Sequence, residues 1–276
     1  MVQFTTYRHD LLKRIDKKHV ITAGNLTHVS QDAEALMLKR VEKRLGKMET
    51  KSVNIIVKSL VKTSAWEELV NSIMGALYEE FKALGEESVD PLVSAARSGV
   101  SNGILQVEIN DTTLVSDVNT VATEWAKERA AELVGMRYDT DGNLIHNPSA
   151  DMAITDSTRN ELRTIVSDLF SQKSVDKEKV VARIKQAGTF SDSRARTIAN
   201  TEISRAQVMG NAKVWEESGV VESIEWFRSE DDPCDECNLN DGEVVAIGTL
   251  FPSGDAYPPV HPNCRCTVSI AELKES

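Results

Sequence analysis

All four cysteines of the chain lie in two short segments, CDEC at residues 234–237 and HPNCRC at residues 261–266. The first segment offers two thiols three residues apart, and the second adds a histidine and two more thiols. Thiolate and imidazole are the ligands of structural zinc, and a Cys-x-x-Cys turn presents both of its thiolates at one point. The candidate zinc ligands are Cys234, Cys237, His261, Cys264 and Cys266.

These five side chains compete for the four positions of a tetrahedral ion. Cys234, Cys237 and Cys264 are the strongest candidates, and either His261 or Cys266 completes the set. In an extended segment Cys264 and Cys266 point to the same side, which favours a four-cysteine site. His-x-x-Cys is itself a common ligand spacing, so the fourth ligand stays open.

Structural zinc is not the only interpretation of these cysteines. They could form disulfides when the protein meets an oxidising medium, or stay reduced in a packed loop. A Cys-His nucleophile would need a third group to orient His261 against Cys264, and the sequence supplies none. We therefore expect structural zinc as the cofactor and no catalytic residue.

The segments that must position the cysteines follow Gly219 and have the character of short strands. The sequence predicts strands at SIEWF (223–227), EVVAI (243–247) and CTVSI (266–270), with an Asn-Asp-Gly turn before the second. So few residues bury little apolar area, and this tail needs a staple or must pack on helices.

The chain before Gly219 is expected to be mostly helical. We expect a first helix at 31–46 with Lys39, Arg40, Lys43 and Arg44 toward water, and a second that begins at a Ser64–Glu67 capping box and ends at Gly85. Pro91, Gly99 and Gly103 should then limit the next stretch to one short helix and an extended ILQVEI segment.

Further helices are expected at 114–135, after a Thr158–Glu161 capping box, from a Ser174 cap to Gly188, and at 193–218. Residues 138–157 read as a turn-rich connector. The fold class is therefore α+β, predominantly helical, with a small β-rich and Cys/His-braced C-terminal module. The expected domains are 1–112 and 113–276, the second divided into a helical part, 113–219, and a tail, 220–276.

The charge of the chain is unevenly distributed. Residues 1–62 hold thirteen Lys and Arg against six Asp and Glu, although the chain as a whole has a net charge of -11. A basic segment of this kind could meet nucleic acid or an acidic protein surface, or be a solvated helix face. The opening residues lack a signal peptide and no apolar run is long enough to span a membrane, so we expect synthesis in a cytoplasm and no membrane partner.

Glu202 falls within the apolar stripe of the helix expected at 193–218. A buried carboxylate needs a partner, so we expect an arginine or backbone donors beside it. A catalytic role is the weaker alternative, because the sequence places no second acid or histidine near it.

The segment from RARTIANTEISRAQ to HPNCRCTV resembles the phage Mu F-like minor head proteins, also called head morphogenesis proteins. The resemblance covers about residues 120–270. It depends on the Thr201–Glu202 pair, the strand with Trp226, the Asp-x-Cys-x-x-Cys element from Asp232, the Gly242 turn and the HPNCRC tail. The family often has an arginine before the Thr-Glu pair, where this chain has Asn200, so its role would pass to Arg205 or Arg194.

The resemblance implies a minor capsid protein of a tailed phage. Such proteins associate with the portal protein inside the head and act in assembly, DNA packaging or genome delivery, so the implied location is the virion. The portal is the implied partner, with the major capsid or scaffolding protein and non-specifically bound packaged DNA as further candidates. The alternative is an enzyme, either a zinc-braced nuclease or an ADP-ribosyltransferase-like protein.

Overall fold

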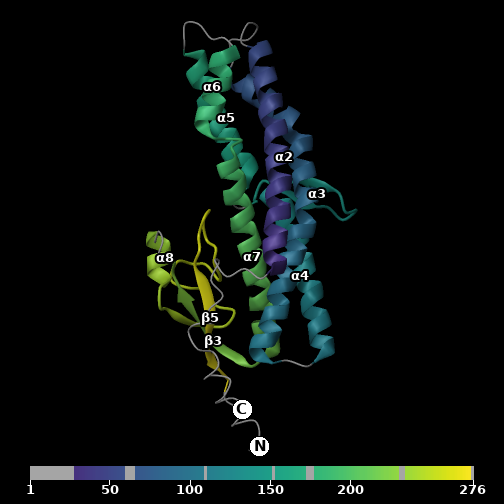
Figure 1. Cartoon of the computed structure of the whole chain (residues 1–276), viewed down its shortest axis with the longest axis vertical. Coiled ribbons are helices and arrows are strands. Elements are labelled where there is room, and N and C mark those ends of the chain that lie inside the picture. The colour runs from purple at the N-terminus through teal and green to yellow at the C-terminus, as the bar shows by residue number, and fades with distance from the viewer. Residues whose placement is uncertain are drawn as a thin grey trace, which may run out of the picture. The chain divides into compact units, whose positions relative to one another are not determined.

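The computed structural model of the protein describes residues 28–59, 66–108, 111–150, 153–171, 177–229 and 234–274. Its longer elements are helices, and two small antiparallel sheets accompany them, so the predicted α+β class is confirmed. The described helices are α2 (His28–Ser59), α3 (Trp66–Val107), α4 (Thr112–Leu133), α5 (Ile154–Phe170), α6 (Lys177–Ala187), α7 (Asp192–Ser218) and α8 (Asp235–Asn240) (Figure 1). Among these helices, none is long and apolar enough to cross a lipid bilayer.

The chain forms two compact units, and each is assembled from separate stretches of sequence. We call the unit made of Met1–Glu34, Leu92–Ala126 and Asn200–Ser276 the C-terminal unit. The unit made of Ala35–Pro91 and Lys127–Ala199 is the helical unit. The domain boundary expected at residue 112 stays a prediction.

In the helical unit, apolar side chains of α2 repeat at helical spacing and are fully buried. Met37, Val41, Leu45 and Met48 line this face. The basic side chains of α2 do not all point to water as predicted. Lys39 and Lys43 are exposed, but Arg40 and Arg44 are half-buried in ion pairs. That part of the prediction is wrong, because acidic residues of α3 lie within their reach.

Arg44 is the centre of this ion-pair group. Its guanidinium donates to Glu80 at 2.7 Å and to Glu87 at 2.9 Å, while Lys51 lies 2.8 Å from Glu80. The hydrogen bond from Arg44 lowers the pKa of Glu87. Burial works to raise the pKa of Glu80, but hydrogen bonds from Lys51 and Arg44 outweigh it and leave that pKa lowered. The group therefore stabilises the packing of α2 on α3 in its ionised form.

Helix α3 runs without interruption from Trp66 to Val107, so the predicted stop at Gly85 and the extended ILQVEI segment are wrong. Gly85, Gly99 and Gly103 of α3 serve packing instead of chain reversal. A Cβ on Gly85 would lie 2.8 Å from a methyl group of Val134. The capping box predicted at Ser64 lies outside the described residues, as does the predicted cap at Ser174.

In the C-terminal unit, α3 and α7 cross with their backbones in contact. A Cβ on Gly99 would lie 2.0 Å from the carbonyl oxygen of Gln207, and one on Gly210 would lie 2.0 Å from that of Ala96. Real Cβ atoms do not approach other atoms so closely, so these positions admit no side chain. Glycine at these positions therefore allows the backbones of α3 and α7 to come into contact.

Three predicted helix ends are confirmed at glycines with left-handed backbone. Helices α6 and α7 end directly before Gly188 and Gly219, and α4 ends at Leu133, shortly before Gly135. The φ angles of Gly135, Gly188 and Gly219 are 70°, 71° and 67°. The capping box predicted at Thr158 is wrong, because α5 begins at Ile154 and the Thr158 hydroxyl donates to the Ile154 carbonyl within the helix.

The connector predicted between α4 and α5 contains a hairpin in addition to its turns. Strand β1 (Met136–Tyr138) pairs antiparallel with β2 (Leu144–His146) in the helical unit. The carboxylate of Asp139 accepts the backbone N–H of Asp141 and of Asn143, which fixes the turn. The prediction for this region therefore missed two strands, each of which is three residues long.

The second sheet belongs to the C-terminal unit and has the order β4-β3-β5. Its strands are β3 (Val221–Phe227), β4 (Val244–Ala246) and β5 (Thr267–Leu273), all antiparallel, at the predicted places. Trp226 is fully buried and meets Phe251 edge to face with ring centroids 5.0 Å apart. Figure 1 shows α8 beside β3 and β5. We call residues 220–274 the tail module.

Candidate metal centre

The site begins at the N-terminus of α8, where the CDEC segment makes a tight turn. Cys234 is the N-cap residue, and its sulfur accepts the backbone N–H of Cys237 at 3.3 Å. The N–H of Asn238 donates to the Cys234 carbonyl at 2.9 Å and closes the turn. N–H groups aimed at sulfur stabilise a thiolate, as they stabilise other anions at helix N-termini.

The second part of the site is the HPNC turn. The N–H of Cys264 donates to the His261 carbonyl at 3.1 Å, and Asn263 has a left-handed backbone with φ of 63°. Asparagine tolerates that conformation better than most residues. The turn therefore presents His261 and Cys264 together, as the first turn presents Cys234 and Cys237.

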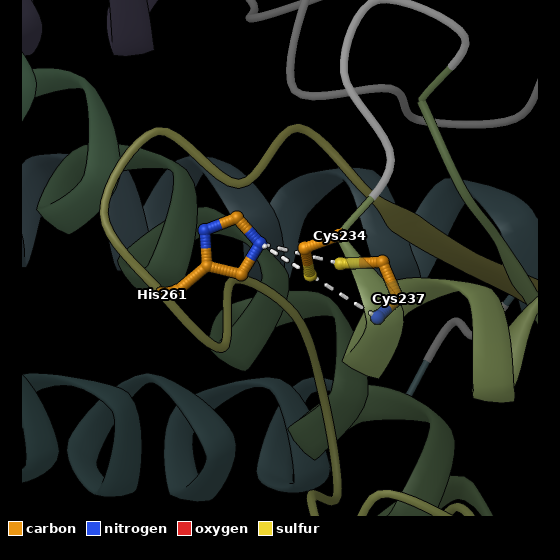
Figure 2. A group of neighbouring side chains, drawn as sticks. All are labelled: Cys234, Cys237 and His261. Carbon is orange, nitrogen blue, oxygen red and sulfur yellow. Dashed lines mark hydrogen bonds between the residues drawn. The ribbon is translucent and has the colours of Figure 1, made fainter.

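The two turns meet through their side chains. Nε2 of His261 lies 3.1 Å from Sγ of Cys234 and 3.4 Å from Sγ of Cys237, and Figure 2 shows the ring facing both sulfurs through this nitrogen. Sγ of Cys237 lies 3.8 Å from Sγ of Cys264. All five predicted residues thus lie in one place, as two overlapping groups that share Cys237: Cys234, Cys237 and His261, and Cys237, Cys264 and Cys266.

The separations fit a metal ion with soft ligands. In a tetrahedron with bonds of about 2.3 Å to sulfur and about 2.0 Å to nitrogen, neighbouring ligand atoms are roughly 3.5–3.8 Å apart. The observed sulfur–sulfur distance of 3.8 Å equals that edge, and the sulfur–nitrogen distances are slightly shorter. The cluster therefore consists of two overlapping groups of three side chains, and each group could hold a metal ion.

The thiols differ in their acidity. Burial raises the pKa of Cys237 to about 12. The hydrogen bond between Cys264 and Cys266 raises the pKa of Cys264 and lowers that of Cys266. A divalent cation would reverse the effect on its ligands, because its charge favours the thiolate. Binding of a metal ion would therefore release protons from these thiols.

Helix α7 holds the second turn in place. Its Thr201 hydroxyl accepts the backbone N–H of Asn263 at 3.1 Å, and Arg205 donates to the Pro259 carbonyl at 3.0 Å. The Tyr257 hydroxyl donates to Glu216 of the same helix at 2.7 Å. These anchoring roles were not predicted, although Thr201 belongs to a motif that the sequence had singled out.

Glu202 is buried at 4% exposure, as its place in the helical stripe predicted. Arg194 directs its guanidinium to the Thr189 carbonyl at 2.6 Å and to the Ser157 hydroxyl at 2.7 Å, within the helical unit. A pairing of Glu202 with Arg194 or Arg205 stays a prediction.

Comparison with known proteins found a family match over the region of this site. Residues 173–269 match the model of a family described as Phage Mu protein F like protein. No curated protein and no solved structure gives a significant match. The matched segment runs from just before α6 into β5 and contains both turns of the cluster, so the resemblance seen in the sequence is confirmed over these residues.

Proposed function

Because residues 173–269 form a phage Mu F-like module, we propose that the protein acts in phage head morphogenesis as a minor component of the virion. The family match is the observation that carries this proposal. It covers a continuous set of elements, from α6 to β5, together with every cysteine of the chain. The matched segment thus includes the whole candidate metal centre, which is more than a short shared motif.

The proposed metal is zinc, in a structural role. Zinc has no redox chemistry and prefers tetrahedral sulfur and nitrogen ligands, which is the donor set of the two turns. When bound, it would cross-link α8 to the loop that Thr201 and Arg205 tie to α7. The tail module would thereby become a rigid part of the C-terminal unit.

The proposed partner is the portal protein inside the head. Arg40 and Arg44 of α2 are less available to DNA, because they are already paired with Asp90, Glu80 and Glu87. Ion pairs of this kind lower the positive charge that is left for phosphate groups. The major capsid or scaffolding protein and non-specific DNA binding are weaker candidates.

Mass spectrometry of purified phage particles tests the proposed location. We expect peptides from this chain in intact particles, at a copy number far below that of the major capsid protein. The portal protein of the same phage should co-elute with the full-length chain when the two are expressed together. Absence from washed particles, together with a failure to associate with portal, would refute the head role.

A binding titration tests the DNA alternative separately. If the chain binds duplex DNA through phosphates, affinity should fall steeply between about 50 and 200 mM salt. We expect weak binding throughout this range. Tight binding that loses orders of magnitude with salt would make DNA, and not portal, the first partner of the basic segment.

A further inference from the structure

The β4-β3-β5 sheet of the tail module has an edge strand on each side, and the two edge strands differ in exposure. On β5, Thr267, Val268 and Leu273 are at most 7% exposed. On β4, Val244 is 50% exposed and Ala246 is exposed as well. The β4 edge is therefore the edge of this sheet that a strand from another molecule could reach.

The backbone of β4 leaves hydrogen-bonding groups pointing away from the sheet. The carbonyl of Glu243 accepts a hydrogen bond from β3 at 3.1 Å, and the N–H of Ile247 donates one to β3 at 3.0 Å. Backbone groups of successive residues point to opposite sides of an antiparallel strand. The N–H groups of Val244 and Ala246 and the carbonyl of Val244 therefore point outward, where an extended segment could pair with them.

Exposed apolar side chains accompany this free edge. Leu239 of α8 is 59% exposed, Val244 of β4 is 50% exposed, and Leu250, which follows β4, is 62% exposed. Natural edge strands are commonly protected from pairing by a charged side chain or a proline. Val244 and Ala246 supply neither, so β4 is open to strand addition.

The chain around β4 is acidic. Residues 234–264 hold five Asp and Glu and no Lys or Arg. Asp241 is paired with Arg228, while Asp235, Glu236 and Glu243 are exposed. A surface of this sign repels the phosphates of nucleic acid and attracts basic side chains. The chemistry that complements it is that of a basic segment of a protein.

The order of side chains along β4 also indicates the pattern of the partner. Glu243 directly precedes Val244, and neighbouring residues of a strand point to opposite faces of the sheet. A strand beside β4 would meet a carboxylate on one face and the apolar side chains of Val244 and Ala246 on the other. Basic and apolar residues in alternation satisfy both faces.

We propose that β4 is a docking surface for an extended segment of a partner protein in which basic and apolar residues alternate. The segment adds to the sheet as a further strand beside β4. Main-chain hydrogen bonds to Val244 and Ala246 supply affinity, and the side chains on the two faces supply specificity. This docking surface requires neither the proposed metal nor the proposed role in the phage head.

NMR titration of the full-length protein with synthetic peptides tests the proposal. The probe is a capped eight-residue peptide of alternating lysine and valine. We expect it to bind, to shift the amide signals of Val244 and Ala246 most, and to slow their hydrogen exchange. A peptide of alternating glutamate and valine should bind at least about tenfold more weakly, because like charges oppose it. The lysine–valine peptide with alternate backbone nitrogens methylated should also lose at least about tenfold, since it cannot complete the ladder.

Variants of the protein locate the surface. Ala246→Pro removes one outward N–H and keeps the side of the strand that bonds to β3, so we expect about five- to tenfold weaker binding of the lysine–valine peptide. Val244→Ser keeps the backbone and removes apolar contact, and should weaken binding about threefold or more. Val220→Ser is the control, because Val220 is 40% exposed in the same module but lies outside β4.

Three results would overturn the proposal. The first is wild-type protein that does not bind the lysine–valine peptide at millimolar concentration. The second is equal binding of the glutamate–valine or the methylated peptide. The third is an equal loss of binding in Val220→Ser and Val244→Ser, or amide shifts centred on β5. The particle experiment decides the head role independently of all three.

Discussion

The helical unit and the tail module are each stabilised by a different kind of interaction. In the helical unit, α2 buries a continuous row of large apolar side chains, and the ion pairs of Arg44 are added at its border. The tail module has three strands, two of seven residues and one of three, around Trp226 and Phe251. Its two turns meet through sulfur and imidazole.

The difference between the two regions indicates when a small region of a protein needs a cross-link for its stability. Burial of apolar surface contributes about 25 cal/mol per Å², so long helices gain enough from packing alone. A short sheet with long loops gains far less, and ligands from separate turns can supply the missing free energy through one ion. Metal loss should therefore affect the tail module and spare the helical unit.

The largest effect is expected for Cys237→Ser, since Cys237 belongs to both groups of the cluster. Structural zinc contributes on the order of 10 kcal/mol of binding free energy in small domains. We expect the variant to lose its metal and the tail module to lose amide hydrogen-exchange protection, while the protection of α2 and α5 remains. Glu236→Gln, an exposed neighbour in α8, is the control and should behave as wild type.

Loss of protection throughout the chain in Cys237→Ser would contradict the separation of the two regions. It would mean that the helical unit also depends on the cluster. Protection unchanged everywhere would show that the tail module folds without its cross-link.

Gly210→Ala should be the most damaging change away from the cysteines. Its Cβ would lie 2.0 Å from the Ala96 carbonyl oxygen, so α3 and α7 must move apart. Overpacking usually costs about 1–3 kcal/mol, and a backbone clash places this variant at or above the upper end. Gly75→Ala is the matched control, because its Cβ meets nothing within 4 Å and alanine favours a helix by up to about 1 kcal/mol. Urea unfolding curves measure the stability of both variants. Equal unfolding midpoints for Gly210→Ala and Gly75→Ala would refute the close contact between α3 and α7.

A smaller effect is expected for Arg44→Ala in the helical unit. The change leaves Glu87 without its main partner and removes one of the partners of Glu80, which keeps Lys51. Removing one member of a partly buried ion pair costs about 2–4 kcal/mol. Lys43→Ala is the control, since its side chain is 56% exposed and its pair with Glu87 should contribute less than about 1 kcal/mol. Thermal unfolding followed by circular dichroism compares the two. A larger loss in Lys43→Ala would contradict the arrangement.

The smallest effect is expected for the pH dependence of the stability that the ion pairs of Arg44 contribute. The pKa of Glu87 is lowered in the folded protein, so its contribution to stability is present above the unfolded value of 4.5 and is lost as pH falls through the folded pKa. The free energy of unfolding of the wild type should therefore fall below about pH 4.5 more steeply than that of Arg44→Ala. If the free energy of unfolding fell equally with pH in the wild type and in Arg44→Ala, the Arg44–Glu87 pair would not be the cause of the loss of stability.

The sequence predicted the features that depend on neighbouring residues. Gly135, Gly188 and Gly219 were recognised as helix ends because a left-handed residue is needed directly after the helix. The three strands of the tail were found from their β-branched and aromatic residues. Gly99 and Gly103 were misread, because they serve a crossing with α7 and their local sequence looks like a break.

Long-range polar contacts were the part that could not be predicted. The pairing of Arg44 with α3 and the bond from Asn263 to Thr201 join residues far apart in sequence, and neither has a local signature. The five candidate ligands were identified by type and spacing. Their grouping around Cys237 and the contact of Nε2 of His261 with two sulfurs required the fold.

The metal content of the purified, reduced protein tests the central claim most directly. The account predicts one zinc ion per chain, and removal of that ion by a strong chelator should unfold the tail module and leave the helical unit intact. A chain that contains no zinc, binds none when it is supplied, and still shows a protected β3–β5 sheet would contradict it.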